Sequence, residues 1–201
     1  MEDFSKVLIG GSYNVVLEKG SDSQVIIEID ENLIKFIDVE VFGRTLDISN
    51  DNYVLSCEKG IDVTVIYSEI EEIKIKGACR LYNEGTLETD FLTLDMSGAG
   101  LIEMKVETKE LMIDISGAGA VELSGITDYQ EVNLSGAGGY KGMDLSSKTC
   151  IIGISGVGGA DVYVEDKLEA RISGLGGVNY HGEPEEVLKD VSGLGTVLRA
   201  D

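Results

Sequence analysis

The sequence predicts an all-β fold, a single-stranded right-handed parallel β-helix (β-solenoid) with rungs of about 19 residues. The motif Ser-Gly-apolar-Gly occurs six times, and successive copies begin 19, 19, 20, 18 and 19 residues apart. Between copies, apolar and polar residues alternate, as in segments 94–96 and 102–104, which is typical of half-buried strands. We therefore expect each rung to lie on its predecessor, with the right-handed winding that parallel crossovers favour.

The repeated motif is predicted to form a sharp corner in each rung, which is a structural role. Glycine adopts positive φ without a Cβ clash, and turns commonly depend on this freedom, so we expect the corner glycines to use it. The corner residues are Ser97, Gly98, Gly100, Ser116, Gly117, Gly119, Ser135, Gly136, Gly138, Ser155, Gly156, Gly158, Ser173, Gly174, Gly176, Ser192, Gly193 and Gly195.

Apolar columns around each Ser predict the interior. The residue before Ser, the residue two after it and the residue five after it are apolar in all six copies. In the second of these columns the side chains become larger along the chain, from Ala99 through Val157 to Leu194. We therefore expect the interior to be filled differently toward the C-terminus. The residue three before Ser is apolar in five copies and is Lys189 in the last.

We predict one domain over residues 1–201. Residues 1–75 lack the corner but keep strand alternation, as in 63–67, and are expected to form irregular N-terminal rungs that cap the stack. Residues 76–201 are expected to form the regular rungs, starting with a degenerate corner at 76–79. The segment from His181 to Val187 contains the only Pro and the only His, and is expected to be a surface loop.

Composition limits the partners. The chain of 201 residues has 16 Lys and Arg against 37 Asp and Glu, a net charge of −21. This charge repels phosphate backbones and anionic lipids, so we expect no nucleic-acid partner. No segment approaches the roughly 18 apolar residues of a membrane span, so we expect no membrane insertion. The first residues lack the features of a secretory leader; the chain is therefore either cytoplasmic or shown without its leader.

The cysteines do not form a disulfide framework, because there are only three and they are widely spaced. Cys57 and Cys79 lie 22 residues apart, close to one rung, so a bridge between stacked rungs is one interpretation. Buried or idle thiols, including Cys150, are the simpler interpretation.

The order of features resembles a bacterial family known mainly from Bacteroidetes, the putative auto-transporter adhesins with a head GIN domain. The resemblance rests on the segment from Gly43 to Ile48, the segment from Ile61 to Tyr67 and the Ser-Gly-x-Gly rungs that follow. It implies a β-solenoid in a cell-envelope or secreted setting, and it brings no catalytic residues to carry over.

Outward polar columns are the candidates for chemistry. Two residues before Ser stand Asp95 and Asp114, followed by Asn133, an oxygen-rich row that can hold Ca²⁺ or act as paired carboxylates. These aspartates are the candidate metal ligands, although a solvated polar face is the simpler interpretation in so acidic a chain. Glu103 and Glu122 form a second outward pair, continued by Lys141 and Asp161. No catalytic or cofactor-binding residues are predicted, and Ca²⁺ is the only candidate cofactor.

We therefore expect a non-enzymatic, adhesin-like binding or scaffold module of the cell envelope or extracellular space, which presents its repetitive faces to a glycan or protein partner. The alternative is a polysaccharide-active enzyme, a lyase or hydrolase, because parallel β-helices host such enzymes. The serines are poor candidate nucleophiles because the chain has one His. A homo-oligomer formed through the terminal rungs is a further expectation.

Overall fold

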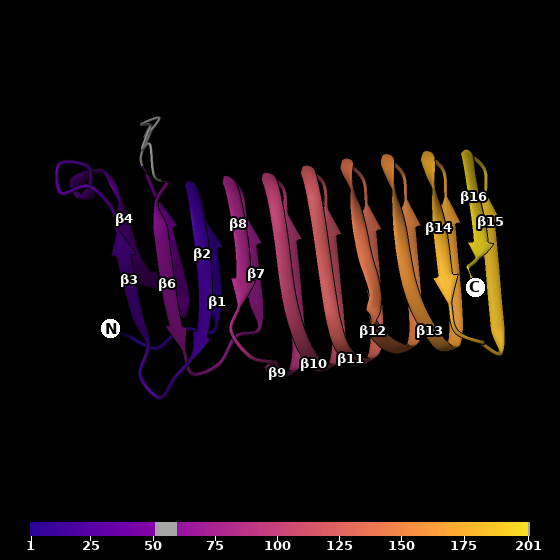
Figure 1. Cartoon of the computed structure of the whole chain (residues 1–201), viewed down its shortest axis with the longest axis horizontal. Coiled ribbons are helices and arrows are strands. Elements are labelled where there is room, and N and C mark those ends of the chain that lie inside the picture. The colour runs from indigo at the N-terminus through magenta and orange to yellow at the C-terminus, as the bar shows by residue number, and fades with distance from the viewer. Residues whose placement is uncertain (51–59, 201) are drawn as a thin grey trace.

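The computed structural model describes residues 1–50 and 60–200. The chain forms a β-solenoid of about 7 turns, 73% of it strand, with rungs about 19 residues apart, so the predicted fold class is confirmed. The rungs stand side by side along the long axis, with the N-terminus near one end and the C-terminus near the other (Figure 1).

Short strands make up the N-terminal part, strands of 10 to 18 residues the middle rungs, and short strands again the C-terminal end. The first group is β1 (Lys6–Ile9), β2 (Ser12–Lys19), β3 (Gln24–Glu28), the 3₁₀ turn η1 (Ile34–Phe36), β4 (Asp38–Phe42), β5 (Thr45–Ser49), β6 (Asp62–Tyr67), β7 (Glu72–Ile75) and β8 (Ala78–Asn83). The second is β9 (Leu87–Met96), β10 (Ala99–Ile115), β11 (Ala118–Leu134), β12 (Ala137–Ile154), β13 (Val157–Ile172), β14 (Leu175–His181), β15 (Glu186–Val191) and β16 (Leu194–Arg199).

Each regular rung bends once between two strand segments. In β10 the segment 99–107 follows the corner and the segment 110–115 leads to the next corner, and both pair in parallel with the same segments of β11. We call the strand segments that follow corners the leading sheet and those that precede corners the trailing sheet. Hydrogen bonds within each sheet run from rung to rung, as in other solenoids.

The N-terminal rungs do not stack in chain order. Strands β1 and β2 lie between β5 and β6 on one side and β7 and β8 on the other. The rung of β7 and β8 lies on β1 and β2, and only the rungs after it each lie on their predecessor, so that expectation is wrong for the first part of the chain. The outermost strands, β3 and β4, pair antiparallel with β6 and β5 and close this end of the stack.

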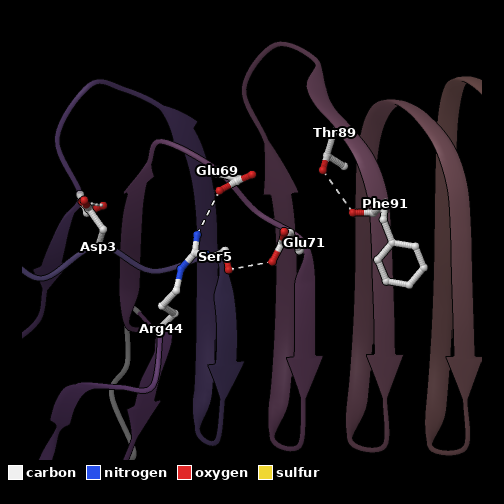
Figure 2. Close-up of polar contacts among 8 residues, drawn as sticks. Asp3, Ser5, Arg44, Glu69, Glu71, Thr89 and Phe91 are labelled. Carbon is white, nitrogen blue, oxygen red and sulfur yellow. Dashed lines mark hydrogen bonds and ion pairs between the residues drawn. The ribbon is translucent and has the colours of Figure 1, made fainter.

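Polar contacts tie the N-terminal segment to the rungs that follow. The buried Ser5 Oγ donates to Glu71 Oε2 at 2.9 Å, and the Arg44 guanidinium pairs with Glu69 Oε2 at 3.0 Å (Figure 2). Ser23 Oγ donates to Asp3 Oδ1 at 3.1 Å. These contacts join residues that are far apart in the sequence, and so they help to hold the non-sequential stacking in register.

The predicted interior is correct for three of the four columns; the residues three before Ser are at most 1% exposed in the first five copies. The residues five after Ser are at most 8% exposed, and the residues just before Ser are at most 3% exposed in the first five copies. The residues two after Ser point outward instead: Val157 is 57% exposed and Leu194 79%. The strand begins at this position, three residues before a buried one, and residues three apart on a strand face opposite sides.

The remaining sequence predictions concern thiols and the late loop. Cys79 and Cys150 are buried free thiols, whereas Cys57 lies outside the described residues. The predicted loop from His181 to Val187 is shorter in the structure: residues 182–185 connect the strands, His181 ends β14, and β15 begins at Glu186. No helix among the described residues is long and apolar enough to cross a membrane.

Candidate functional site

The Ser-Gly corners are positioned by the backbone of the preceding rung. At each corner the N–H groups of Ser and of the first Gly both donate to one carbonyl oxygen; for example, Ser116 and Gly117 both donate to Met96 O at 3.0 and 3.1 Å. A Cβ built on Gly117 would lie 1.8 Å from Gly98 O. Of the corner glycines only Gly100 has positive φ, 146°, so the expectation of positive φ is corrected: close backbone approach is what requires glycine here.

A second repeated bend was not noticed in the sequence. Thr89, Thr108 and Thr127 occupy one column, 19 residues apart. Each hydroxyl donates to the carbonyl oxygen two residues later, at 3.2, 3.1 and 3.0 Å respectively, and Figure 2 shows the contact from Thr89 to Phe91. Local hydroxyl bonds of this kind stabilise turns. The regular spacing of Thr was the sequence signal for this bend.

The outer face of the leading sheet carries a groove of about 890 Å³. Its floor reaches Met104 and Leu123, each 3% exposed. One wall is a row of register partners that crosses successive rungs: Tyr82, Glu103, Glu122, Lys141 and Asp161. A second row runs beside it: Lys105, Ser124 and Asp144.

Most charges in the first row are paired across rungs. Arg80 donates through Nη2 and Nε to Glu103 Oε2, at 2.8 and 3.2 Å. Lys141 donates to Glu122, and this bond raises the pKa of the Lys141 ammonium. Asp161 accepts a hydrogen bond from the Asn179 amide at 2.8 Å. These contacts hold the side chains of the row in place before any ligand arrives.

The second row is unpaired. Within the part of the chain that the structure describes, neither Lys105 nor Asp144 forms a side-chain ion pair or hydrogen bond, and both are exposed. Tyr82, at the N-terminal end of the first row, is 40% exposed. The groove thus offers a partly exposed aromatic ring, one free ammonium group and one free carboxylate along neighbouring rungs.

A family model described as "Putative auto-transporter adhesin, head GIN domain" matches residues 3–184. The chain belongs to this family. The family supports a non-enzymatic, adhesin-like role at the cell surface or outside the cell. No curated protein is detectably similar in sequence.

Solved structures share the fold of this family member. A putative adhesin from Bacteroides fragilis aligns with a TM-score of 0.94 at 22% identity, over 99% of this chain and 93% of its own. A putative adhesin from Parabacteroides merdae gives 0.74 at 22% identity, over 100% and 93%. A putative lipid binding protein from Parabacteroides distasonis gives 0.77 at 21% identity, over 100% and 94%. At these identities the likeness concerns the fold.

The candidate metal ligands of this adhesin-family chain lie on the other side of the solenoid. Asp95 and Asp114 are register partners on the trailing sheet, with Asn133 next, as the spacing predicts. Lys74 follows at one end of the row. Across residues 1–50 and 60–200, no group of three or more His, Cys, Asp or Glu side chains is placed to hold a metal ion. The Ca²⁺ expectation therefore gains no further support from these residues.

The groove was only partly visible in the sequence. The row from Glu103 to Asp161 was predicted from its spacing. Arg80 and Asp144 were missed, and no periodic tyrosine column singled out Tyr82. Arg80 and Tyr82 belong to the degenerate rung, where the motif is weak, and Asp144 follows a register shift that obscures its column.

Proposed function

We propose that this family member is a surface-exposed, adhesin-like module that holds a glycan chain in the groove of the leading sheet without cleaving it. The observation that carries the proposal is the partly exposed Tyr82 ring beside two polar rows that repeat with the rungs. A tyrosine ring offers an apolar face to the C–H groups of a sugar, and the rows offer donors and acceptors to its hydroxyls.

The scaffold favours binding because its side chains are ordered beforehand. The groove lies on parallel strands whose rungs bond to their neighbours along their length, and ion pairs such as Arg80–Glu103 restrict the side chains in it. Ordering side chains in advance reduces the entropy lost on binding. A chain ligand that runs across the rungs meets equivalent positions at roughly 4.8 Å intervals.

Adjacent carboxylates in the groove make a polysaccharide-active enzyme the second candidate. Glycoside hydrolysis needs one protonated carboxyl as acid and a second carboxylate as base or nucleophile. Glu103 and Glu122 are instead both engaged by basic partners, Arg80 and Lys141. These ion pairs favour binding over proton donation.

The test compares two aromatic variants in glycan binding. Tyr82→Ala removes the ring in the groove, whereas Phe91→Ala removes a similarly exposed ring, 42% exposed, from β9 outside the groove. We expect Tyr82→Ala to weaken binding to immobilised polysaccharides about 10-fold, because loss of a well-placed aromatic contact is worth on the order of 1–2 kcal/mol. Phe91→Ala should bind as the parent does. Affinity electrophoresis over a panel of neutral, acidic and amino polysaccharides gives the measurement.

Three outcomes contradict the proposal. Equal losses of glycan affinity in Tyr82→Ala and Phe91→Ala would show that the glycan does not bind in the groove. The chain could instead bind none of the polysaccharides and capture a purified protein partner, with Tyr82→Ala abolishing the capture. That result would mean that the ligand of the groove is a protein and not a glycan. New reducing ends or unsaturated products in the polysaccharide would favour the enzyme.

A further inference from the structure

The charges in the groove do not cancel. The two ion pairs Arg80–Glu103 and Lys141–Glu122 are internally neutral. Among the described residues, three other carboxylates line the groove, Asp62, Asp144 and Asp161, and one other cation, Lys105. Asp62 and Asp161 accept hydrogen bonds from neutral amides, Asn14 and Asn179, which leave their charge in place. The groove therefore carries excess negative charge that a ligand can neutralise.

Two of the three uncompensated carboxylates, Asp144 and Asp161, lie at a distance from the aromatic ring. Tyr82 and Lys141 are three rungs apart in one row, which is about 14 Å at roughly 4.8 Å per rung. Asp144 lies in the same rung as Lys141, and Asp161 lies in the next one. A ligand that contacts both the ring and these carboxylates must therefore span several sugar units, so a monosaccharide is too short.

The rest of the molecule adds to the same field. The chain carries a net charge of −21, and a groove lined by one sign of charge concentrates ions of the opposite sign. An anionic glycan is repelled in this field. A glycan with amino groups gains attraction to Asp144 and Asp161, and an ammonium group close to Tyr82 gains a cation–π contact.

Building on the glycan-binding role proposed above, we propose that the groove selects oligosaccharides with free amino groups, and that Asp144 is a specificity-determining residue. Asp144 is the carboxylate in the groove without a charged or hydrogen-bonding partner among the described residues. It is therefore the group most available to bind a ligand ammonium without breaking an existing contact. Lys105, two rungs away in the same row, sets the opposite preference at the other end of that row.

The experiment uses two ligands that differ only in the amine. Isothermal titration with a glucosamine hexasaccharide and with the matching N-acetylglucosamine hexasaccharide, at mildly acidic pH and low salt, compares a charged with a neutral chain. We expect the amino form to bind at least 10-fold more tightly. Asp144→Asn should reduce that preference about 5-fold, because an exposed charge pair contributes up to about 1 kcal/mol. Asp114→Asn on the trailing sheet, with the same change in net charge, should leave it unchanged.

The outcomes separate this inference from the general one. Equal binding of the two hexasaccharides overturns amine selection and leaves glycan binding in the groove intact. Failure of both hexasaccharides and of the whole polysaccharide panel overturns glycan binding as well. Equal effects of Asp144→Asn and Asp114→Asn, or full competition by a lysine oligopeptide, would mean that overall charge attracts the ligand, and would overturn the role of Asp144.

Discussion

At the Ser-Gly corner the backbone of one rung lies against the carbonyl oxygen of the rung before it. A Cβ on Gly117 or on Gly136 would lie 1.8 or 2.1 Å from that oxygen, closer than atoms can approach without the backbone moving. Gly139, only a few residues further on, has no atom within 3.4 Å of a Cβ; its nearest neighbour is Gly159 O at 3.6 Å. The corner glycines therefore cannot accept a side chain without a backbone shift, whereas Gly139 can.

We expect Gly117→Ala to destabilise the fold by about 3 kcal/mol, because the added methyl must displace backbone that is hydrogen-bonded to the next rung. The matched control Gly139→Ala should be neutral or stabilising by about 0.5–1 kcal/mol, because alanine loses less conformational entropy in a strand. Urea unfolding of the two variants measures both effects. Similar free energies of unfolding for the two would show that backbone contact does not explain the motif.

At the scale of an element, β12 shows how one longer rung is accommodated. Its register shifts twice, between Gly142 and Ser146 and between Ser147 and Thr149, and it buries Tyr140 in a column that otherwise holds small or aliphatic residues. Tyr140 Oη donates to Gln130 Oε1 at 2.6 Å, Gln130 Nε2 donates to Ser147 Oγ at 2.8 Å, and Ser147 Oγ donates to Tyr163 O at 2.8 Å. This chain of bonds satisfies every member, which buried polar groups require.

The same strand should make stability fall at alkaline pH. Burial raises the pKa of the Cys150 thiol from 9.0 to about 12, and burial also raises the pKa of Tyr140 well above 10.0. Above pH 9 the unfolded chain loses the thiol proton while the folded chain keeps it, so the unfolded state binds fewer protons and the free energy of unfolding decreases as pH rises toward 12.

We expect Cys150→Ala to make this decrease shallower by up to about 1.4 kcal/mol per pH unit, the value for one titrating group. Ile152→Val, a neighbouring core substitution without a titratable group, should lower stability while its pH curve stays parallel to the parent's. Urea titrations between pH 8 and about 11 provide the comparison. A parallel curve for Cys150→Ala would mean that the thiol does not titrate between the two states.

At the scale of the whole molecule, the two ends of the stack differ. Antiparallel strands β3 and β4 close the N-terminal end, whereas β15 and β16 end the described stack and leave Val191 42% exposed in a column that is buried in the other rungs. In the same rung Lys189 takes a place that is apolar in the other five copies; its ammonium donates to Val197 O at 3.0 Å and lies 5.3 Å from the centroid of the Tyr180 ring. An inward-placed lysine on an edge strand opposes pairing with another edge.

We expect Lys189→Ile to strengthen end-to-end association of this chain, because it restores an apolar column and removes a charge from the open edge. Lys148→Ile, which changes an exposed lysine at a bend, should leave the mass unchanged. Size-exclusion chromatography with light scattering, over a range of concentrations, gives the mass of each variant. Equal masses for the parent and Lys189→Ile would show that Lys189 does not oppose association at this edge. Assembly through the terminal rungs stays a prediction for the parent chain.

Much of the fold was readable from the sequence because each rung is a local pattern. The spacing of the six corners and the alternation between them predicted the solenoid and three buried columns. The outward direction of Val157 and its equivalents was also contained in that alternation and was overlooked. The Thr residues at 89, 108 and 127 also indicate the second bend by their regular spacing, and the sequence prediction did not use them.

The candidate site was harder to predict because it depends on contacts between rungs. The row from Glu103 to Asp161 follows from equal spacing, but the pairing of Arg80 with Glu103 joins a degenerate rung to a regular one. Asp144 enters its row only after the register shift in β12. Where one rung is longer than the others, its residues no longer align at a fixed spacing of 19, so a fixed period places the wrong residue in the row.

The amino-acid sequence by itself determined the rung, because strand alternation and the Ser-Gly corner act over a few neighbouring residues. Only the tertiary structure decided how the rungs are ordered, with β1 between β5 and β7 and with β2 between β6 and β8. It also decided which charges in the groove stay unpaired. Those outcomes depend on hydrogen bonds and ion pairs between segments far apart in the chain, and no local pattern encodes such partners.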